Sequence, residues 1–441
     1  MADASSQRVV IVGAGPAGLL LTHYLLRRGY TVEIYEQRPD PREVDPSQRR
    51  SFPITLQQRG RTGLQGISGL EESIGQYSTF CQGTVVHSKN KARDIKRNNV
   101  LLTVDRNQLT LALLQHLTEQ YASTTFTLRF NCVCQSIDIA QRVVTFKDKQ
   151  AEDTNRDGFA ASDRLFTVSF DRLVGADGAN SRVRQELVEH HQLGCTQTLI
   201  SDAYKSLFLA RTNPEQDIAL APDRLHTANT GTSGRVVLAP QPGDRLHGAF
   251  VFNAEKNPFA SFTTKEDVLT FFEEKLPTFR PLLSDTDAEG LLQRPVARLT
   301  TVKCDRLHEG DRVLLIGDAA HAVSPSIGQG CNAALEDVAI IDQLLDRYQD
   351  DWSQALPQFS QRRVPDAHAL IDLSDHAFPR SKMLVAEFFL RLIVGRKLNK
   401  WFPQWFKPFL LDLVVDSDLP YAEVLKLSQG WVNKVKASMA P

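Results

Sequence analysis

The sequence predicts an α/β protein that has a parallel sheet, an inserted β-rich unit and a helical C-terminal region. Three observations support this fold class. A strand pattern, a glycine-rich turn and a helix pattern follow one another over residues 8–28. A second apolar strand that ends in a glycine-rich turn occupies residues 311–332. Between them, residues 195–300 are rich in short strand patterns, and after residue 333 the pattern is almost wholly helical.

The composition is that of a globular protein with roughly two or three domains. Of the 441 residues, 42% are hydrophobic and 23% are charged, and the net charge of −1 gives no reason to expect a nucleic-acid partner. The six cysteines are too scattered for a disulfide framework or a zinc module, so we expect no metal site. We find no signal-peptide pattern and no apolar run of about 18 residues, and therefore expect a cytoplasmic protein.

The first motif, Gly13-Ala-Gly15-Pro-Ala-Gly18, lies between the first strand and the first helix. Gly13 permits a tight turn, Gly15 lets the backbone approach a pyrophosphate, and Gly18 lets the helix pack closely on the strand. Glu36 ends the second strand, where a carboxylate can bind both hydroxyls of an adenosine ribose. This Rossmann-type pattern predicts a site for FAD or NAD, because an acid at that position disfavours the 2′-phosphate of NADP.

The second motif, Gly317-Asp318-Ala-Ala-His321, follows the late apolar strand. A carboxylate at Asp318 can accept hydrogen bonds from the hydroxyls of a polyol chain. Backbone N–H groups of residues 328–330 and Asn332 can face a ring oxygen that carries partial negative charge. FAD is long enough to reach from the first motif to such a site through its ribityl chain, so this motif favours FAD. We expect His321 to be a structural residue.

The third motif, Asp177-Gly178-Ala-Asn-Ser181-Arg-Val-Arg184, follows a short apolar strand at residues 173–176. Together the three motifs resemble the group A FAD-dependent aromatic hydroxylases, and the resemblance covers nearly the whole chain. It implies a Rossmann-type FAD-binding domain with an inserted substrate domain. It also implies that NAD(P)H reduces the FAD, and that O2 then forms a flavin C4a-hydroperoxide that hydroxylates an aromatic or quinone-like small molecule.

Within that family, the chain is most similar to the kynurenine 3-monooxygenase branch. The likeness lies in the segments at residues 50–60, 104–106 and 363–374. The motifs and this likeness together imply the following cofactor-binding residues: Gly13, Gly15, Ala17, Gly18, Glu36, Arg38, Thr55, Arg106, Cys134, Asp177, Asp318, Pro325, Gly328, Gly330, Cys331 and Asn332.

The chain departs from that branch where the amino-acid substrate is held. Gln82, Val100 and Ala377 replace the branch's Arg, Tyr and Asn, and Ser326 and Ile327 replace two aromatic residues of the flavin loop. An anionic substrate without its arginine would be left desolvated and unpaired, at a cost of several kcal/mol. We therefore do not expect kynurenine, and favour a neutral aromatic or quinone-like substrate. The candidate substrate residues are Gln82, Val100, Phe252, Ser326, Ile327 and Ala377; no catalytic side chain is assigned.

These observations predict three regions. The FAD-binding domain comprises residues 1–75, 100–190 and 295–350, and the substrate domain comprises 76–99 and 191–294. A helical region covers 351–441.

Two questions stay open at the level of sequence. Residues 385–415 mix aromatic and aliphatic residues with Arg and Lys, which is typical either of helices that pack over the substrate domain or of peripheral membrane contact. The function can also be that of an epoxidase or reductase of an isoprenoid on the same fold, or of a non-catalytic FAD-binding protein.

Overall fold

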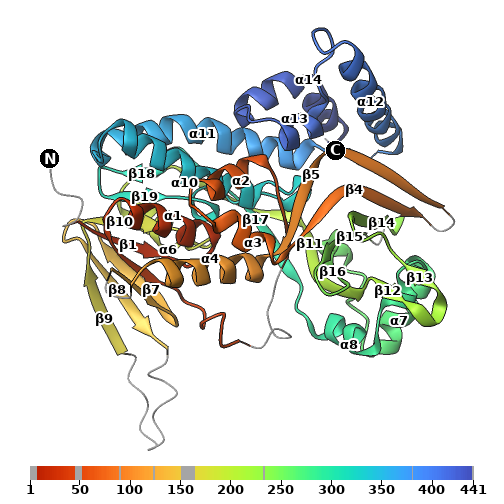
Figure 1. Cartoon of the computed structure of the whole chain (residues 1–441), viewed down its shortest axis with the longest axis horizontal. Helices are drawn as coiled ribbons and strands as arrows, with labels where there is room; N and C mark the ends of the chain where they lie inside the picture. Colours follow the sequence, from red (N-terminus) through yellow and green to blue (C-terminus); the bar gives the residue numbers. More distant parts are fainter. Residues whose placement is uncertain are drawn as a thin grey trace, which may run out of the picture.

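A computed structural model of the chain describes residues 7–44, 52–88, 91–122, 125–149, 164–231, 234–379 and 381–439, apart from the side chains of Asn98 and Lys382. Figure 1 shows a layered α/β body on one side, a larger sheet with its own helices on the other, and a helical region that lies across the top. The polar stretch between residues 148 and 164 falls largely outside the described residues, as do Arg50 and Ser51 of the family-like segment.

The first sheet has six strands in the order β18-β19-β10-β1-β2-β6, all parallel except the edge strand β18. Its middle strands are continuous apolar runs because both of their faces are covered, as in other parallel sheets. The bounds are β1 Arg8–Val12, β2 Thr31–Tyr35, β6 Phe126–Arg129, β10 Arg172–Gly175, β18 His308–Glu309 and β19 Val313–Leu315.

Helices and a small sheet cover this first sheet. The helix α1 packs against α4 and α10 in one layer, where Arg28 pairs with Asp342 at 2.7 Å. The antiparallel sheet β7-β8-β9 stacks Phe146 on Tyr35 of β2, with ring centroids 4.2 Å apart. The elements are α1 Pro16–Arg27, α2 Gln58–Gln65, α3 Leu70–Gly75, α4 Arg106–Gln120, α6 Arg182–His190, α9 Asp318–His321, α10 Gly330–Arg347, β7 Cys132–Asp138, β8 Val143–Asp148 and β9 Arg164–Ser169.

The second sheet has eight strands in the order β17-β11-β16-β15-β14-β4-β5-β3. Two helices cover one of its faces, and Phe250, Phe252 and Phe272 form part of the core between them. A capping box of Thr264 and Asp267 begins the first of these helices. The bounds are β3 Pro53–Leu56, β4 Ser78–Ser88, β5 Lys91–Asp105, β11 Cys195–Ala210, β14 Arg224–Asn229, β15 Arg235–Gln241, β16 Arg245–Asn253, β17 Ala297–Cys304, α7 Lys265–Lys275, α8 Asp285–Gln293 and, in a separate hairpin, β12 Thr212–Asn213 and β13 Ile218–Ala219.

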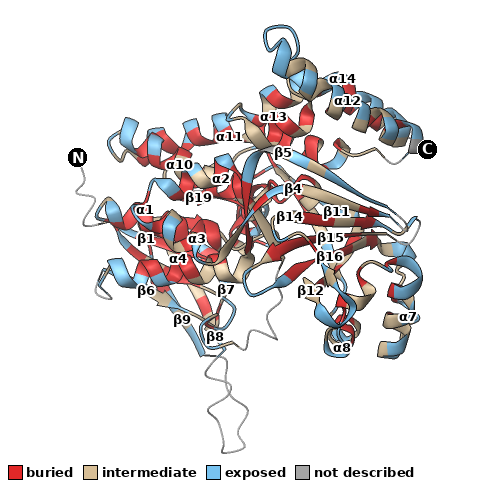
Figure 2. Cartoon of the chain, turned by 45° about the vertical axis from the view of Figure 1, so that its right-hand side comes forward, coloured by how far each residue is buried: buried red, intermediate tan, exposed pale blue. Residues whose placement is uncertain are grey.

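The C-terminal region is helical, as its pattern predicts. Figure 2 shows that the long helix α11 buries the side that faces the body and exposes the other. None of the helices among the described residues is long and apolar enough to cross a membrane. The bounds are α11 Trp352–His376, α12 Lys382–Trp401, α13 Leu410–Asp416 and α14 Tyr421–Met439.

Buried apolar residues form separate clusters in the first sheet with its helices, in the second sheet under α7 and α8, and in the C-terminal helices. Strand pairing nevertheless crosses the expected domain limits. The strands β3 and β17, expected in the FAD-binding domain, both pair into the second sheet. The first half of the long strand β5, with many exposed polar residues, forms a projecting ribbon with β4 (Figure 1).

Candidate cofactor site

Four sequence motifs meet at one edge of the six-stranded sheet. Gly13 follows β1, Glu36 follows β2, Asp177 follows β10, and Gly317 follows β19. These strands are parallel neighbours in the order β19-β10-β1-β2, so their carboxyl ends lie side by side. In open α/β sheets this edge is where ligands bind. The fold therefore brings together segments that lie in distant parts of the chain.

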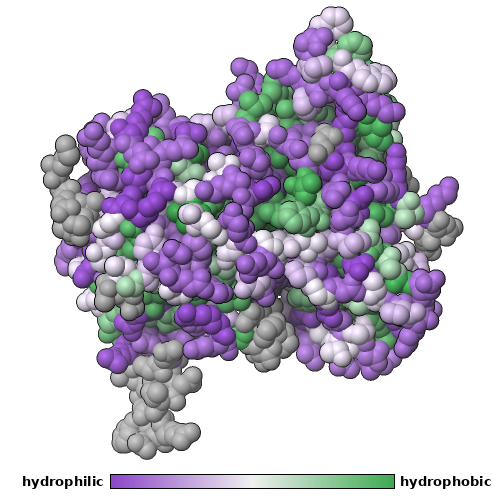
Figure 3. Space-filling view, viewed as in Figure 1, coloured by the Kyte–Doolittle hydropathy of each residue, from purple (hydrophilic) through white to green (hydrophobic). Residues whose placement is uncertain are grey.

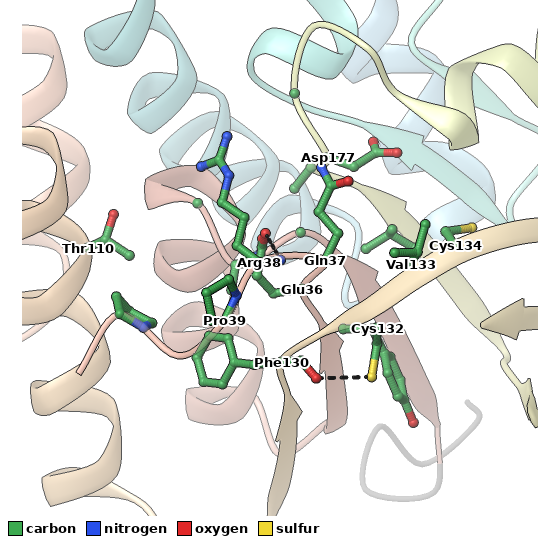
Figure 4. A pocket seen from close by; sticks show the side chains of 18 of the residues that line it. Glu36, Gln37, Arg38, Pro39, Thr110, Phe130, Cys132, Val133, Cys134 and Asp177 are labelled. Carbon is green, nitrogen blue, oxygen red and sulfur yellow. Dashed lines mark hydrogen bonds between the residues drawn. The ribbon is translucent and has the colours of Figure 1, made fainter. Parts of the chain in front are cut away.

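A cavity of about 170 Å³ opens at this edge (Figure 4). Residues from the β1–α1 turn, the segment after β2, the start of α4, the strand β7 and the turn after β10 line it. Its lining includes seven of the expected cofactor residues: Gly13, Gly15, Glu36, Arg38, Arg106, Cys134 and Asp177.

The glycines of the first motif have the backbone geometry that their expected roles require. Gly13 has a φ of +106°, and a Cβ there would lie 2.4 Å from the carbonyl oxygen of Ala176. A Cβ on Gly18 would lie 2.2 Å from the Gly13 carbonyl oxygen, whereas one on Gly15 would meet no atom within 4 Å. Gly15 thus leaves open space at the positive N-terminus of α1, where a pyrophosphate fits.

The Glu36 carboxylate is fixed at the rim of the cavity by backbone hydrogen bonds. The Ala14 N–H donates to Oε2 and the Arg38 N–H donates to Oε1, each at 2.9 Å. Figure 4 shows the carboxylate held between these two segments. Each oxygen retains a further lone pair, so both can accept hydroxyl groups of a ribose.

Asp177 carries a buried oxygen that lacks a protein partner. Its Oδ2 accepts the Arg182 N–H at 2.7 Å, but its Oδ1 has no hydrogen-bond partner among the described residues. Burial raises the pKa of this carboxyl group. An unsatisfied buried acceptor is costly, so this atom fits a ligand that donates a hydrogen bond. Burial also raises the pKa of the neighbouring Cys134 thiol to about 12, which keeps it neutral.

The remaining cofactor residues lie beside this cavity rather than in its lining. Ala17 and Gly18 belong to α1, and the others follow β19 or belong to β3. Asn332 connects these last two segments. Its fully buried amide donates to the carbonyl oxygens of Thr55 and Gly328, each at 2.9 Å, and accepts the Gln57 N–H at 2.8 Å. Since its side chain is used in this way, Asn332 can meet a ligand only through its backbone, whose N–H lies in the unpaired first turn of α10.

A buried ionic network holds the loop that begins at Gly317. Asp337 on α10 accepts the Gly317 N–H at 2.9 Å, His321 Nε2 at 2.6 Å and Arg363 Nε at 2.7 Å. Burial alone would raise the pKa of Asp337, but the charges of His321 and Arg363 outweigh it and lower that pKa. The placement of His321 in this network agrees with the structural role expected for it.

Direct contacts join the nucleotide end of the site, at the cavity, to the flavin end, at the loop after β19. A Cβ on Gly317 would lie 3.4 Å from the Ala17 Cβ. Arg184, in the third motif, donates to the carbonyl oxygen of Ala319 at 2.9 Å. Burial raises the pKa of the Cys331 thiol to about 12, and the charges of Arg106 and Asp318 also act on it. The nucleotide end and the flavin end thus form one continuous site.

The candidate substrate residues do not meet in one cavity among the described residues. Gln82 and Val100 are exposed on β4 and β5. The Ser326 hydroxyl donates to the Ser374 carbonyl oxygen, and Ile327 and Ala377 pack in the core of the C-terminal helices.

Phe252 requires a correction. It is only 2% exposed and packs with Phe250 and Phe259 in the core beneath α7. Since side chains alternate along a strand, Phe250 and Phe252 share the helix-covered face of the sheet. Its placement therefore does not support contact with a substrate.

Sequence reasoning missed a buried polar relay between the flavin loop and the C-terminal helices. The Tyr421 hydroxyl donates to Gln329 Oε1 at 2.8 Å, and Gln329 Nε2 donates to Gln57 Oε1. All three side chains are buried. Only the position of Gln329 between two glycines of the flavin loop could have hinted at this relay, because the residues come from three distant segments.

Comparison with known proteins places this geometry in a family. Residues 6–374 match the model of an FAD-binding domain family. The chain is 30% identical to kynurenine 3-monooxygenase of Legionella pneumophila (strain Corby), over 96% of this chain and 91% of the relative. It is 28% identical to kynurenine 3-monooxygenase of Sus scrofa, over 98% and 88% respectively.

A solved structure shares the fold at low identity. The tetrameric form of 2-methyl-3-hydroxypyridine-5-carboxylic acid oxygenase superposes with a TM-score of 0.67 at 21% identity, covering 84% of this chain and 91% of that one. This likeness concerns the fold alone. With the motifs, the cavity and the family match in agreement, the chain belongs to the FAD-dependent aromatic hydroxylase family of flavoprotein monooxygenases, and its cofactor is FAD.

Proposed function

We propose that this monooxygenase uses NAD(P)H and O2 to hydroxylate a neutral aromatic or quinone-like small molecule. The observation that carries the proposal is the convergence of the four motifs at one edge of the first sheet, beside a cavity with an unsatisfied Asp177 oxygen. Bound FAD would be reduced by NAD(P)H and would activate O2. The protein then has to bind, orient and shield the reactants.

Different residues of the chain would bind and orient the parts of the cofactor. The open space at Gly15 and the N-terminus of α1 would hold the pyrophosphate, and Glu36 would hold the ribose. Asp318 would accept hydrogen bonds from the ribityl hydroxyls. The free N–H groups in the first turn of α10 would stabilise negative charge that develops on the flavin ring.

The substrate class rests on the residues beside two expected substrate positions. Cys81 and Leu101, the neighbours of Gln82 and Val100, pack with Leu225 in an apolar cluster that also contains Ala239 and contacts Val415 of α13. Each residue of the cluster is at most 9% exposed, so this region is dry as well as apolar. Because side chains alternate along a strand, Gln82 and Val100 point to the opposite face, and this apolar core lies beneath them. With Gln82 in place of the branch's Arg, this arrangement supports a neutral ring over an anion.

One residue favours a second substrate class, a ring that carries a carboxylate. The Nε of Arg97 on β5 is buried and has no hydrogen-bond partner in the described part of the chain. Burial lowers the pKa of its guanidinium group, while Asp412 and Asp416 offset the charge only in part. A buried cation with an unmet donor favours an anionic ligand.

The test measures O2 consumption and product by the purified FAD-loaded protein with NADPH or NADH. The panel would hold neutral phenols and quinones, ring carboxylates, kynurenine and a prenylated quinone. We expect product formation with a neutral member. Epoxide or reduced product from the prenylated quinone would support the isoprenoid alternative, and no NAD(P)H oxidation with any compound would support a non-catalytic protein.

Arg97→Met separates the two substrate classes. If a carboxylate is the substrate, the variant should raise its KM by about tenfold or more, since a charged hydrogen bond of about 1.5–3 kcal/mol is lost. If the substrate is neutral, KM should be unchanged. Lys91→Met, on the exposed start of the same strand, is the matched control.

We also propose that residues 383–415, from α12 into α13, contact a membrane surface. Met383, Leu390, Trp401 and Trp405 are 62–78% exposed there, among several Arg and Lys residues. Figure 3 shows hydrophobic surface near the C-terminal helices on one face of the molecule. Aromatic and basic residues together favour an anionic lipid interface. Cosedimentation with anionic vesicles should fall for the double variant Trp401→Ser and Trp405→Ser; unchanged cosedimentation would contradict the contact.

A further inference from the structure

Two cysteines face each other where the chain passes into and out of the second sheet. Cys195 begins β11, which leads the chain away from the six-stranded body, and Cys304 ends β17, which returns it. They are direct partners in the antiparallel register, and their Sγ atoms are 3.5 Å apart. Both are free thiols in the structure. We name these two strand ends the neck.

The neck has the backbone geometry of a disulfide. The adjoining pair of Gly194 and Asp305 is joined by a hydrogen bond from the Asp305 N–H to the Gly194 carbonyl oxygen at 2.8 Å. Cys195 and Cys304 therefore occupy the next, non-hydrogen-bonded pair, where Cα atoms are about 4.5 Å apart. That separation lies within the range of roughly 4.4–6.8 Å found in disulfides. Rotation of the two side chains can close the bond without movement of the strands.

The two thiols differ in reactivity. Cys304 donates its S–H to Cys195, and this bond lowers the pKa of Cys195 to about 7, with further help from the charge of Arg184. The same bond, together with burial, raises the pKa of Cys304. Cys195 is partly exposed, whereas Cys304 is only 2% exposed. Cys195 thus suits attack on a small oxidant, and Cys304 suits the second step.

We propose that the neck is a redox modification site, in which hydrogen peroxide converts the two thiols to a reversible disulfide. The Cys195 thiolate attacks one peroxide oxygen, the O–O bond breaks, and sulfenic acid and water form once a proton is taken up. The Cys304 sulfur then attacks the sulfenic sulfur, the S–S bond forms, and a second water leaves. Two thiols lose two electrons in total, and peroxide gains them. A dithiol reductant reverses the change.

The disulfide would act on the flavin end of the cofactor site. Next to the neck, the Val302 N–H donates to the Ala322 carbonyl oxygen at 2.9 Å. Arg184, which acts on the Cys195 thiolate, also holds the Ala319 carbonyl oxygen at 2.9 Å. Both contacts hold the turn that follows Asp318. A crosslink that restrains β17 therefore restrains this turn and should slow the release of FAD.

The test uses the full-length FAD-loaded protein, treated with hydrogen peroxide and then alkylated. We expect two of the six thiols to be lost, and peptide mapping to find Cys195 joined to Cys304. Release of FAD in urea should require a higher urea concentration after peroxide, and dithiothreitol should reverse this shift. Cys195→Ser and Cys304→Ser should each abolish the shift, while Cys81→Ser, a buried thiol elsewhere, should retain it.

Three results would overturn the proposal. The first is recovery of both neck thiols unlinked after peroxide, and the second is a Cys195 sulfinic acid without crosslink. The third is an equal urea shift in Cys195→Ser. Peptide mapping of the unaltered protein decides the first two, even where a serine variant fails to fold. The proposal does not depend on the substrate or on catalysis, so failure of the hydroxylation assay would leave it intact.

Discussion

The nucleotide end and the flavin end of the cofactor site are held in place by different kinds of structure. At the nucleotide end, the glycine turn and Glu36 belong to one short βαβ unit, and their contacts are almost all with nearby backbone. At the flavin end, the loop from Gly317 to Asn332 is fixed by side chains from α10, α11 and α14 and by the Thr55 carbonyl oxygen of β3. The glycine turn and Glu36 at the first end are local in sequence, although the β10 turn at Ala176 packs against Gly13. The second end depends far more on the assembled protein.

This difference has a consequence for substitutions. Substitutions at the nucleotide end should alter FAD binding with limited effect on folding stability. The exception is a glycine at which a new side chain would clash with the backbone. Changes in the network behind the flavin loop should reduce folding stability and FAD binding together, because buried charges lose their partners. Measuring both folding stability and FAD affinity for each variant therefore tests this difference between the two ends.

The largest effect is expected for Asp337→Asn, at the centre of the flavin-end network. The amide is similar in shape but removes the carboxylate that faces His321, and it leaves Arg363 with only Glu336 and Asp366 as charged partners. Loss of one partner of a buried ionic cluster costs about 3–5 kcal/mol. We expect urea denaturation to show this loss and the purified protein to carry little FAD. Glu387→Gln, in a surface ion pair with Arg391, is the control and should change stability little.

Acid should lower the folding stability of the protein through His23, which lies on α1 at the nucleotide end. This buried side chain on α1 contacts the Leu113 carbonyl oxygen, and burial lowers its pKa to about 4. The unfolded chain binds a proton near pH 6.5 and the folded protein does not, so stability falls between pH 6.5 and about 4. The full contribution is roughly 3 kcal/mol. His23→Gln should flatten this part of the stability curve, whereas an unchanged slope would contradict the assignment.

The first two glycines of the β1–α1 turn, Gly13 and Gly15, should respond differently to replacement by alanine. In Gly13→Ala, the new Cβ meets the Ala176 backbone at a φ of +106°, so we expect strain of at least about 1–3 kcal/mol and a lower Tm. In Gly15→Ala, no protein atom lies within 4 Å, so Tm of the FAD-free protein should be unchanged while FAD binding weakens. An equal loss of Tm in Gly13→Ala and Gly15→Ala would contradict the open space assigned to Gly15.

The contrast between the ends also explains what the sequence could reveal. The strand β1, the helix α1 and Glu36 were predictable because the residues that make them lie within one short segment. The Asp337 network and the Gln57–Gln329–Tyr421 relay were not predictable. Their members come from α9, α10, α11, α14 and the residues just before α2 and α10, and they carry no local pattern. Phe252 was misjudged because hydrophobic alternation does not tell which face of a sheet is covered by helices.

Asp318→Ala should weaken FAD binding without a large loss of stability. Its carboxylate stands at the start of α9, next to the buried Cys331, and is not part of the Asp337 cluster. We expect at least about tenfold weaker FAD binding, or about 1.4 kcal/mol, measured by flavin fluorescence titration. Asp311→Ala, before β19 and exposed in part, is the matched control. Unchanged FAD occupancy in Asp318→Ala would refute the role assigned to this carboxylate.

The smallest effect is expected for Tyr421→Phe, which tests whether the C-terminal helices reach the flavin loop. The change removes one buried hydrogen bond to Gln329 and leaves the ring over Arg59, whose guanidinium carbon lies 4.2 Å from the ring centroid. A loss of about 1–2 kcal/mol is expected, because the Gln329 acceptor becomes unsatisfied. If the relay holds the loop, FAD should also dissociate several-fold faster. Tyr348→Phe, at the far end of α10, is the control. If Tyr421→Phe loses this stability but its rate of FAD dissociation is unchanged, the relay stabilises only the C-terminal helices.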